Sequence, residues 1–307
     1  MIGDRIVEWL LEGDVSIQYQ VQRDIVGKEI PELQACIATG GWGKRFLDAR
    51  KANGHWGRGF YQVKWISSHY SLLDLKHLNI VPTQPEIRES IGIILREQKS
   101  DDGGINPSRQ IKESDVCVNG MFLNYACYFK ANEPDLHSVV DFVITQQMPD
   151  GGFNCRFNRQ GAVHSSLHST ISILEGIQEY ISNGYTYRRG ELDRISAEAR
   201  EFILQHRLYL SDRTGKIIDK RFLMLSYPSR WRYDILRALD FFRAADIDYD
   251  ERMRPALNVL HKKRRKDGTW PVQAKHPGQV HFDMEHTGRP SRWNTLRALR
   301  VLKRYSE

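Results

Sequence analysis

The stretch Gln147-Met148-Pro149-Asp150-Gly151-Gly152-Phe153 contains the turn that decides the fold of this 307-residue chain. Similar turns occur at Asp102-Gly103-Gly104 and at Asp267-Gly268-Thr269-Trp270. Looser copies lie at Gly40-Gly41-Trp42 and Asn53-Gly54-His55-Trp56. Each full copy follows a helix-like stretch, and a turn that recurs between such stretches is typical of repeat proteins.

The segments after the turns carry apolar residues at helical spacing, as in 118–125, 169–177, 234–242 and 294–302. When these segments are aligned, one position is shared by His69, Cys117, His168, Tyr233 and Trp293. They lie about 50 to 65 residues apart, which suits a two-helix repeat with its loops. With a weaker copy at 16–26, the pattern predicts an all-α fold, an α/α toroid of about six helical hairpins in which residues 1–307 form one domain with an inner and an outer ring of helices.

The turn at 147–153 resembles the Gln-to-Trp repeat of the prenyltransferase and squalene cyclase family, and the resemblance extends over nearly the whole chain. It is also similar to the repeat by which a group of bacterial and archaeal proteins is recognised. The acidic motifs of the cyclases, Asp-x-Asp-Asp and Asp-Asp-x-x-Asp, are absent from the sequence. Triterpene cyclisation is therefore disfavoured.

The segment 109–117 most closely resembles the β-subunit of protein prenyltransferases, whose pattern is Arg-x-x-Lys-x-x-Asp-x-Cys. The resemblance implies that Arg109 and Lys112 bind a diphosphate. It also implies that zinc is the cofactor, held by Asp115, Cys117 and, in the next repeat, His168. Equivalent positions in successive repeats lie side by side in a ring, so these three side chains are expected to meet and to leave a fourth position open, as in catalytic zinc sites. A helix cap for Asp115 and a core thiol for Cys117 are the simpler alternatives.

Departures from the family pattern concern substrate specificity. The Tyr beside the zinc Cys is Val118 here, the pocket Trp is Met121, and Ser165 and Leu167 replace the Asp and Tyr before the zinc His. Protein prenyltransferases also need a partner subunit, so an unidentified protein partner is one expectation. Prenylation of a protein tail does not follow from this chain alone.

Other side chains are expected to line the cavity of the ring. His69 and His164 are candidates for a catalytic role, as a proton donor, as a fourth ligand or as a group that orients a ligand. Aromatic side chains suit an apolar or isoprenoid substrate, although core packing is the simpler explanation for each. The candidate cavity residues are Trp65, Tyr70, Trp231, Tyr233 and Trp293.

Composition limits the other classes of function. The formal net charge is +7, and the densest basic run, 262–266, is expected to be a solvated helix end, so nucleic acid binding is not predicted. No apolar run reaches the length of a membrane span, and the four cysteines are too few for a disulfide framework, so a cytoplasmic location is expected.

The sequence thus favours a zinc-dependent, prenyltransferase-like enzyme acting on an isoprenoid or other phosphorylated apolar molecule. Two alternatives stay open. One is a non-catalytic toroid that binds a lipid or serves as a scaffold. The other is a carbohydrate-active toroid enzyme, for which Asp283 and Glu285, beside His286, are the compact acidic candidates.

Overall fold

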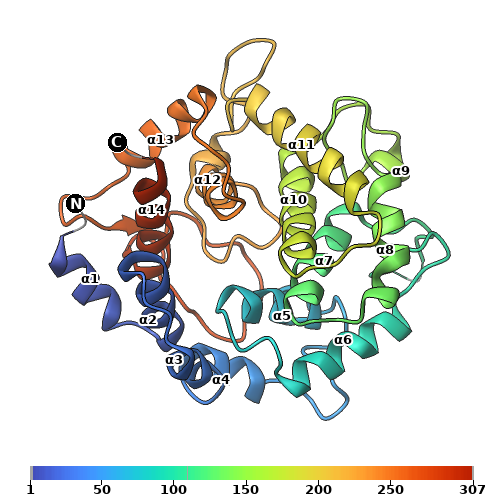
Figure 1. Ribbon diagram of the computed structural model, residues 1–307, viewed down its shortest axis with the longest axis horizontal. Coiled ribbons are helices and arrows are strands. Elements are labelled where there is room, and N and C mark those ends of the chain that lie inside the picture. Colours follow the sequence, from blue (N-terminus) through green and yellow to red (C-terminus); the bar gives the residue numbers. More distant parts are fainter. Residues whose placement is uncertain (1–2, 109, 306–307) are drawn as a thin grey trace. The chain divides into compact units, whose positions relative to one another are not determined.

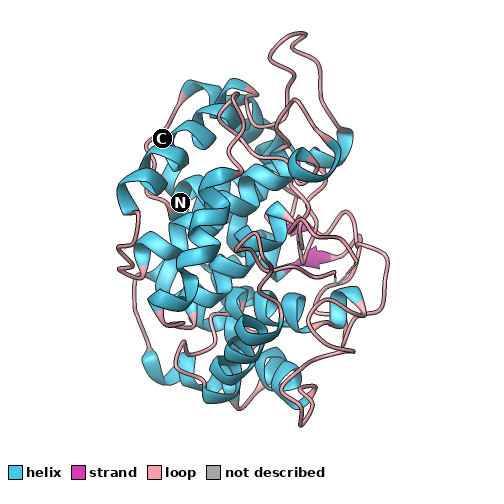
Figure 2. Ribbon diagram, turned by 90° about the vertical axis from the view of Figure 1, so that its right-hand side faces the viewer, coloured by secondary structure: helices cyan, strands magenta, loops and turns pink. Residues whose placement is uncertain are grey.

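The computed structural model describes residues 3–108 and 110–305, and most of these residues lie in helices (Figures 1 and 2). The chain forms two compact units. Unit 1 comprises the described parts of Met1–Ala49, His77–Val81 and His206–Glu307, and unit 2 comprises Arg50–Lys76 and Pro82–Gln205. Within the described residues, no helix is long and apolar enough to span a membrane.

Unit 2 carries the central part of the sequence (Figure 1). Its elements are a 3-10 turn at Lys64–Ile66 and the helices α5 (Ser68–His77), α6 (Pro85–Glu97), α7 (Val116–Tyr128), α8 (Glu133–Thr145), α9 (Phe157–Gln160), α10 (Leu167–Ser182) and α11 (Arg189–Gln205).

Unit 1 combines the two ends of the sequence. Its α-helices are α1 (Asp4–Leu11), α2 (Val15–Val21), α3 (Pro31–Ala35), α4 (Gly41–Asp48), α12 (Ile235–Ala244), α13 (Arg254–Lys262) and α14 (Arg292–Tyr305). Short 3-10 or π-helical turns occupy Gln22–Val26, Cys36–Ala38, Lys220–Leu223 and Glu251–Met253. The strands β1 (Trp270–Pro271) and β2 (Pro290–Ser291) pair antiparallel, Trp270 opposite Ser291, among the loops (Figure 2).

The helices of unit 2 differ in how they are buried, and this difference separates inner from outer helices. Helix α7 buries Val116 and every residue from 118 to 127, so it is covered on all sides. In α6 the buried residues are Ile87, Ser90, Ile91 and Ile94, which form one face of a helix. Helix α7 therefore belongs to the interior, as does α10, most of whose residues are buried, whereas α6 leaves one side to solvent.

The two inner helices pack closely against each other (Figure 1). A Cβ added to Gly120 of α7 would lie 2.5 Å from the backbone oxygen of Ser172 in α10. A Cβ on Gly176 of α10 would in turn collide with the backbone oxygen of Gly120. Only glycine at both positions allows the backbones to come so near.

The repeated turns have the same local structure. Gly103, Gly151 and Gly268 have φ values of 85°, 86° and 85°, a left-handed conformation that favours glycine. The residue two places further on then bonds to the following inner helix. The bonds run from the backbone N–H of Ile105 to Asn119 Oδ1 (2.7 Å), of Phe153 to Thr170 Oγ1 (3.0 Å) and of Trp270 to Thr295 Oγ1 (3.0 Å).

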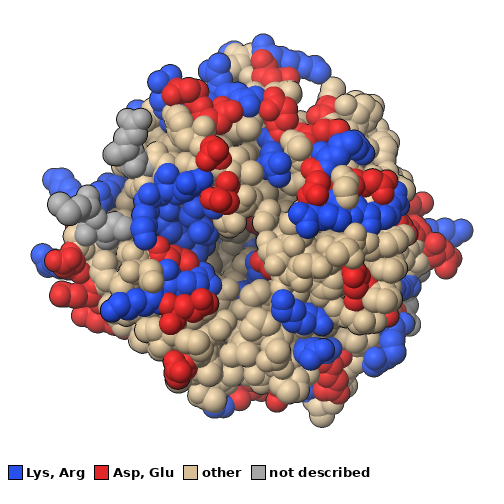
Figure 3. Space-filling view, in the orientation of Figure 1, with Lys and Arg blue, Asp and Glu red and all other residues tan. Residues whose placement is uncertain are grey.

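Basic side chains gather over α14 on the face shown in Figure 3. Part of this charge is neutralised within unit 1, because Arg300 Nη1 lies 3.0 Å from Asp24 Oδ2 and Arg300 Nε lies 2.7 Å from Asp240 Oδ1. The basic run at 262–266 is mostly exposed and begins at the last residue of α13, the helix-end position that the sequence predicts.

Candidate metal centre

The candidate site of unit 2 begins at the N-terminus of α7. Asp115 is the residue before the helix, and its Oδ1 accepts hydrogen bonds from the backbone N–H of Cys117 (3.1 Å) and of Val118 (3.2 Å). The thiol of Cys117 also donates to Asp115 Oδ1, at 3.1 Å. The carboxylate thus caps the helix and contacts the Cys117 thiol at the same time.

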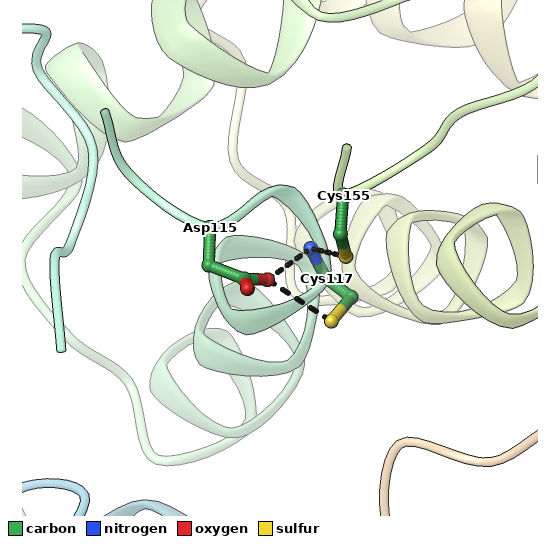
Figure 4. A group of neighbouring side chains, drawn as sticks. All are labelled: Asp115, Cys117 and Cys155. Carbon is green, nitrogen blue, oxygen red and sulfur yellow. Dashed lines mark hydrogen bonds between the residues drawn. The ribbon is translucent and has the colours of Figure 1, made fainter. Parts of the chain in front are cut away.

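A second cysteine reaches this point from the turn at 147–153. Cys155 lies two residues beyond Phe153, and its backbone N–H donates to Ser169 Oγ in α10 (3.0 Å). Its Sγ accepts from the backbone N–H of Cys117 (3.2 Å) and from Ser169 Oγ (3.1 Å). Figure 4 shows the side chains of Asp115, Cys117 and Cys155 converging.

These three residues are a candidate metal centre. One carboxylate oxygen of Asp115 and the sulfurs of Cys117 and Cys155 all lie within 4.8 Å of one another, and each residue is partly exposed. Two thiolates and a carboxylate are ligands that suit zinc. The donor set is therefore compatible with zinc, with room for a fourth ligand.

The electrostatics of the centre also suit a cation. The hydrogen bond with Cys155, burial and the negative charge of Asp115 raise the pKa of the Cys117 thiol well above its usual value. A divalent cation would reverse this effect, because it stabilises both thiolates. Among the described residues, Arg159 of α9 forms an ion pair with the Asp115 carboxylate, with its Nη1 3.3 Å from Asp115 Oδ2.

The other residues that the sequence predicts for this site are not among the three residues of the cluster. His168 is the second residue of α10 and partly buried, but it is not a member of the three-residue cluster. Lys112 is exposed in the loop before α7, and Arg109 lies outside the described residues. His164 is exposed, and its backbone oxygen accepts from Asn154 Nδ2 (2.8 Å).

Aromatic side chains from residues 60–70 pack beside the centre. Burial raises the pKa of the Tyr61 phenol, and the charges of Cys117, Asp115 and Cys155 raise it further, so Tyr61 lies within electrostatic reach of the cluster. Its hydroxyl lies 3.2 Å from that of Tyr70. Tyr70 is fully buried and its ring meets that of Trp65 at a centroid distance of 4.8 Å.

His69, the second residue of α5, is enclosed by these rings. It has no solvent exposure, and burial lowers the pKa of its imidazole to about 3, so the ring is neutral at pH 7. Nδ1 lies 3.3 Å from the Tyr125 hydroxyl, whereas the buried Nε2 has no hydrogen-bond partner in the part of the chain that the structure describes. A buried nitrogen of this kind calls for a bound water or ligand.

The remaining cavity candidates lie in unit 1. Tyr233 is 3% exposed and donates to the backbone oxygen of Leu208 at 2.6 Å, which is a core contact. Trp293 is 2% exposed and stacks on Trp42, with a centroid distance of 6.3 Å. Trp231 is partly exposed, and the Arg232 guanidinium lies 4.8 Å from the centre of its ring.

The two acidic candidates of unit 1, Asp283 and Glu285, differ in their exposure to solvent. Asp283 is exposed and paired with Lys275, and His286 is exposed. Glu285 Oε1 accepts from the backbone N–H of Trp293 at 3.0 Å, and burial raises the pKa of this carboxyl to about 6. Glu285 is thus a partly buried carboxyl at the start of α14 rather than a solvated loop residue.

The sequence alone did not single out Cys155, which belongs to the candidate centre, or Tyr61, which lies beside it. Cys155 had a signal, because the turns Asp102-Gly-Gly-Ile-Asn-Pro107 and Asp150-Gly-Gly-Phe-Asn-Cys155 align residue by residue. The sixth residue of the second turn is Cys155, and its sulfur lies beside Cys117 at the start of α7. Tyr61 lies in a loop without regular periodicity, and no pattern in the sequence marks it.

No family model and no curated protein matches this sequence. Several solved structures match over nearly its whole length. A polysaccharide lyase aligns with a TM-score of 0.55 and 11% identity, over 97% of this chain and 95% of that chain. A family 88 glycosyl hydrolase from Bacteroides vulgatus aligns with a TM-score of 0.50 and 12% identity, over 97% of this chain and 95% of that chain.

A type II terpene cyclase from Scytonema aligns with a TM-score of 0.45 and 10% identity, over 94% of this chain and 85% of that chain. The matches with the polysaccharide lyase and the glycosyl hydrolase confirm the predicted all-helical α/α toroid fold, and both of these proteins are enzymes by name. At such identities the similarity concerns the fold, which hosts several chemistries.

Proposed function

We propose that this chain is a zinc-dependent enzyme whose metal is held by Asp115, Cys117 and Cys155 in unit 2. The observation that carries the proposal is the convergence of one carboxylate and two sulfurs within 4.8 Å of one another. The donor set supports zinc more than magnesium or calcium, which prefer oxygen ligands. In this proposal the third ligand is Cys155 instead of His168.

The proposed substrate is an apolar molecule, isoprenoid or similar, that carries a phosphate or another anionic group. The buried rings of Trp65 and Tyr70 and the partly exposed ring of Tyr61 beside the cluster support an apolar body. The anionic group rests on the resemblance of 109–117 to a diphosphate-binding segment. When bound, zinc would supply a Lewis acid that polarises an oxygen or lowers the pKa of a coordinated nucleophile.

The chain's own side chains then have defined tasks. The Tyr61 phenol has a pKa above its ordinary value of 10.0 and is therefore protonated at pH 7, so it can donate a hydrogen bond to a developing negative charge. His69 stays neutral, and its free Nε2 can bind one polar atom of the substrate without adding charge. The surrounding rings exclude water from that atom.

Cobalt(II) in place of zinc provides a direct test, because thiolate ligands give it an intense near-ultraviolet absorption. We expect the metal-free protein to develop this band on titration with cobalt(II), and the band to weaken in Cys117→Ser and in Cys155→Ser. A band that is absent, or that neither substitution changes, would contradict the proposed ligands. Diphosphate release from farnesyl diphosphate, with water or a small thiol as acceptor, then tests the reaction.

A carbohydrate-active enzyme is the second candidate, and Glu285 favours it. A carboxyl with a pKa of about 6 is suited to general acid catalysis near neutral pH, and the toroid fold is shared with a polysaccharide lyase and a glycosyl hydrolase. Cleavage of an acidic polysaccharide that is lost in Glu285→Gln but retained in Cys117→Ser would favour this candidate over the zinc enzyme.

A further inference from the structure

Two of the four cysteines of this chain lie together in unit 2 although they come from different segments. Cys117 is the second residue of α7, and Cys155 follows the turn before α10, 38 residues later in the sequence. Their sulfurs lie within 4.8 Å of each other. Both side chains are partly exposed, so a small oxidant in solution can reach them.

The two sulfurs have different surroundings. The Sγ of Cys155 accepts two hydrogen bonds, from the backbone N–H of Cys117 (3.2 Å) and from the Ser169 hydroxyl (3.1 Å). The Sγ of Cys117 is instead a donor, to Asp115 Oδ1 at 3.1 Å. The two donors thus hold the Cys155 sulfur beside Cys117, and Cys117 has a carboxylate in place to receive its proton.

We propose that Cys117 and Cys155 form a reversible disulfide when the protein meets hydrogen peroxide, and that this disulfide switches the metal centre off. The chemistry concerns the two thiols alone. Its regulatory meaning, the loss of the metal, rests on the proposed function.

The reaction has two steps. The thiolate of Cys155 attacks one peroxide oxygen, the O–O bond breaks, and hydroxide leaves and takes up the proton that Cys155 gave up, so that Cys155 carries a sulfenic acid and one water is released. The sulfur of Cys117 then attacks the sulfur of Cys155 and passes its proton by way of Asp115 to the departing hydroxide. In total, two thiols and one hydrogen peroxide give one disulfide and two waters. The two electrons lost by the sulfurs reduce the peroxide.

Disulfide formation and metal binding exclude each other. The disulfide consumes both thiolates, and Asp115, already 3.3 Å from Arg159, is then the one ligand left in the cluster. One carboxylate does not hold zinc against water. Conversely, zinc bound to both sulfurs occupies the lone pairs that attack peroxide, so the loaded site is protected.

The other cysteines provide internal controls. Cys36 is exposed in unit 1, and Cys127 is fully buried in α7. Neither belongs to a cluster of potential metal ligands among the described residues. We expect Cys127 to stay reduced and Cys36 to react, at most, on its own.

The test uses the full chain in metal-free and zinc-loaded form. After treatment with one equivalent of hydrogen peroxide, the metal-free protein should lose two free thiols, and peptide mapping without reductant should show the Cys117–Cys155 cross-link, reversed by dithiothreitol. Zinc-loaded protein should react at least ten times more slowly. A cross-link between other cysteines, or stable oxidation of Cys155 without a cross-link, would overturn the proposal.

Single variants test the order of the steps. In Cys117→Ser the sulfenic acid on Cys155 should persist and be captured by dimedone, whereas in Cys155→Ser residue Cys117 should remain unlabelled. Asp115→Asn in the metal-free protein should slow cross-linking without preventing dimedone capture in the Cys117→Ser background. Labelling of Cys117 in place of Cys155 would contradict the assignment. A metal-free protein that forms the disulfide but never binds zinc would refute the proposed function alone, and zinc binding without a disulfide would refute this inference alone.

Discussion

The backbone N–H of Cys117 donates a 3.2 Å hydrogen bond to the Sγ of Cys155, from the start of one inner helix to the turn before the next. This contact joins two successive repeats at the point where α7 begins. The carboxylate of Asp115 completes the group from the position just before the helix. The candidate metal centre thus follows from where the repeat places its turns and helix starts.

Asp115 has two separable roles, a helix cap and a metal ligand. In metal-free protein, Asp115→Ala should lower the free energy of unfolding by about 1 kcal/mol, because the N–H groups of Cys117 and Val118 lose their acceptor. Asp115→Asn should keep most of this stability, since asparagine also caps helices well. Both variants should bind zinc more weakly. Urea unfolding and zinc titration measure the two effects, and equal stability of all three proteins would refute the cap.

The contact between α7 and α10 depends on Gly120. Gly120→Ala should destabilise unit 2 by about 1 to 3 kcal/mol, because the new methyl group would collide with the backbone oxygen of Ser172. Gly190→Ala is a suitable control, since nothing lies within 4 Å of the Cβ that it would add. Thermal unfolding of both variants is the measurement. A Gly120→Ala protein as stable as the control would show that the helices are further apart.

Glu285 makes stability depend on pH. Its pKa is about 6 in the fold and 4.5 as the ordinary value, so the folded chain binds the proton more tightly than the unfolded chain. The free energy of unfolding should therefore fall by about 2 kcal/mol as the pH rises from below 4.5 to above 6.

In Glu285→Gln this decrease should be absent, because glutamine resembles the neutral acid. Asp283→Asn, a change at an exposed residue of the same loop, is the matched control and should retain it. Urea unfolding of both variants across this pH range measures the effect. An identical pH dependence in Glu285→Gln and in the unmodified protein would mean that Glu285 is solvated.

The unsatisfied Nε2 of His69 should lower the free energy of unfolding, and a ligand bound to this nitrogen should raise it again. An unsatisfied buried nitrogen costs about 1 to 3 kcal/mol, so replacing both members of the pair, as His69→Phe with Tyr125→Phe, should leave the ligand-free protein at least as stable at pH 7. The pKa of His69 is lowered to about 3 in the fold, so the unfolded chain binds the proton more tightly than the folded chain. The free energy of unfolding should therefore fall as the pH falls from 6.5 toward 3, and the double variant should lack this decrease.

The same double variant should lose turnover or binding of the apolar substrate while keeping its zinc. His164→Gln, at an exposed histidine, is the control for both stability and function. A double variant that is strongly destabilised at pH 7 would show that the His69–Tyr125 contact is structural instead.

Much of the fold could be predicted because the repeat is encoded locally. The aligned residues His69, Cys117, His168 and Trp293 are each the second residue of a helix, in α5, α7, α10 and α14. Tyr233 departs from this register, because α12 begins only after Asp234 has capped it.

The site could be predicted only in part. The pair Asp115 and Cys117 lies on one helix start, so its spacing in the sequence fixes its geometry. The third member depends on the path of the turn at 150–155, which sequence spacing does not describe, and there Cys155 takes the place expected of His168. The partial burial of Glu285 could not be predicted for a similar reason, since it involves a contact with the backbone of Trp293 in α14.

The central claim is that Asp115, Cys117 and Cys155 hold zinc, and metal analysis of the purified, tag-free protein tests it most directly. The account predicts about one zinc per chain, lost in Cys117→Ala and Cys155→Ala and retained in His168→Ala and in the control Cys36→Ala. Loss of zinc in His168→Ala but not in Cys155→Ala would restore the histidine as the third ligand. Protein that stays metal-free after refolding with zinc would contradict the account and leave the alternatives of a carbohydrate-active enzyme and of a non-catalytic toroid that binds a lipid.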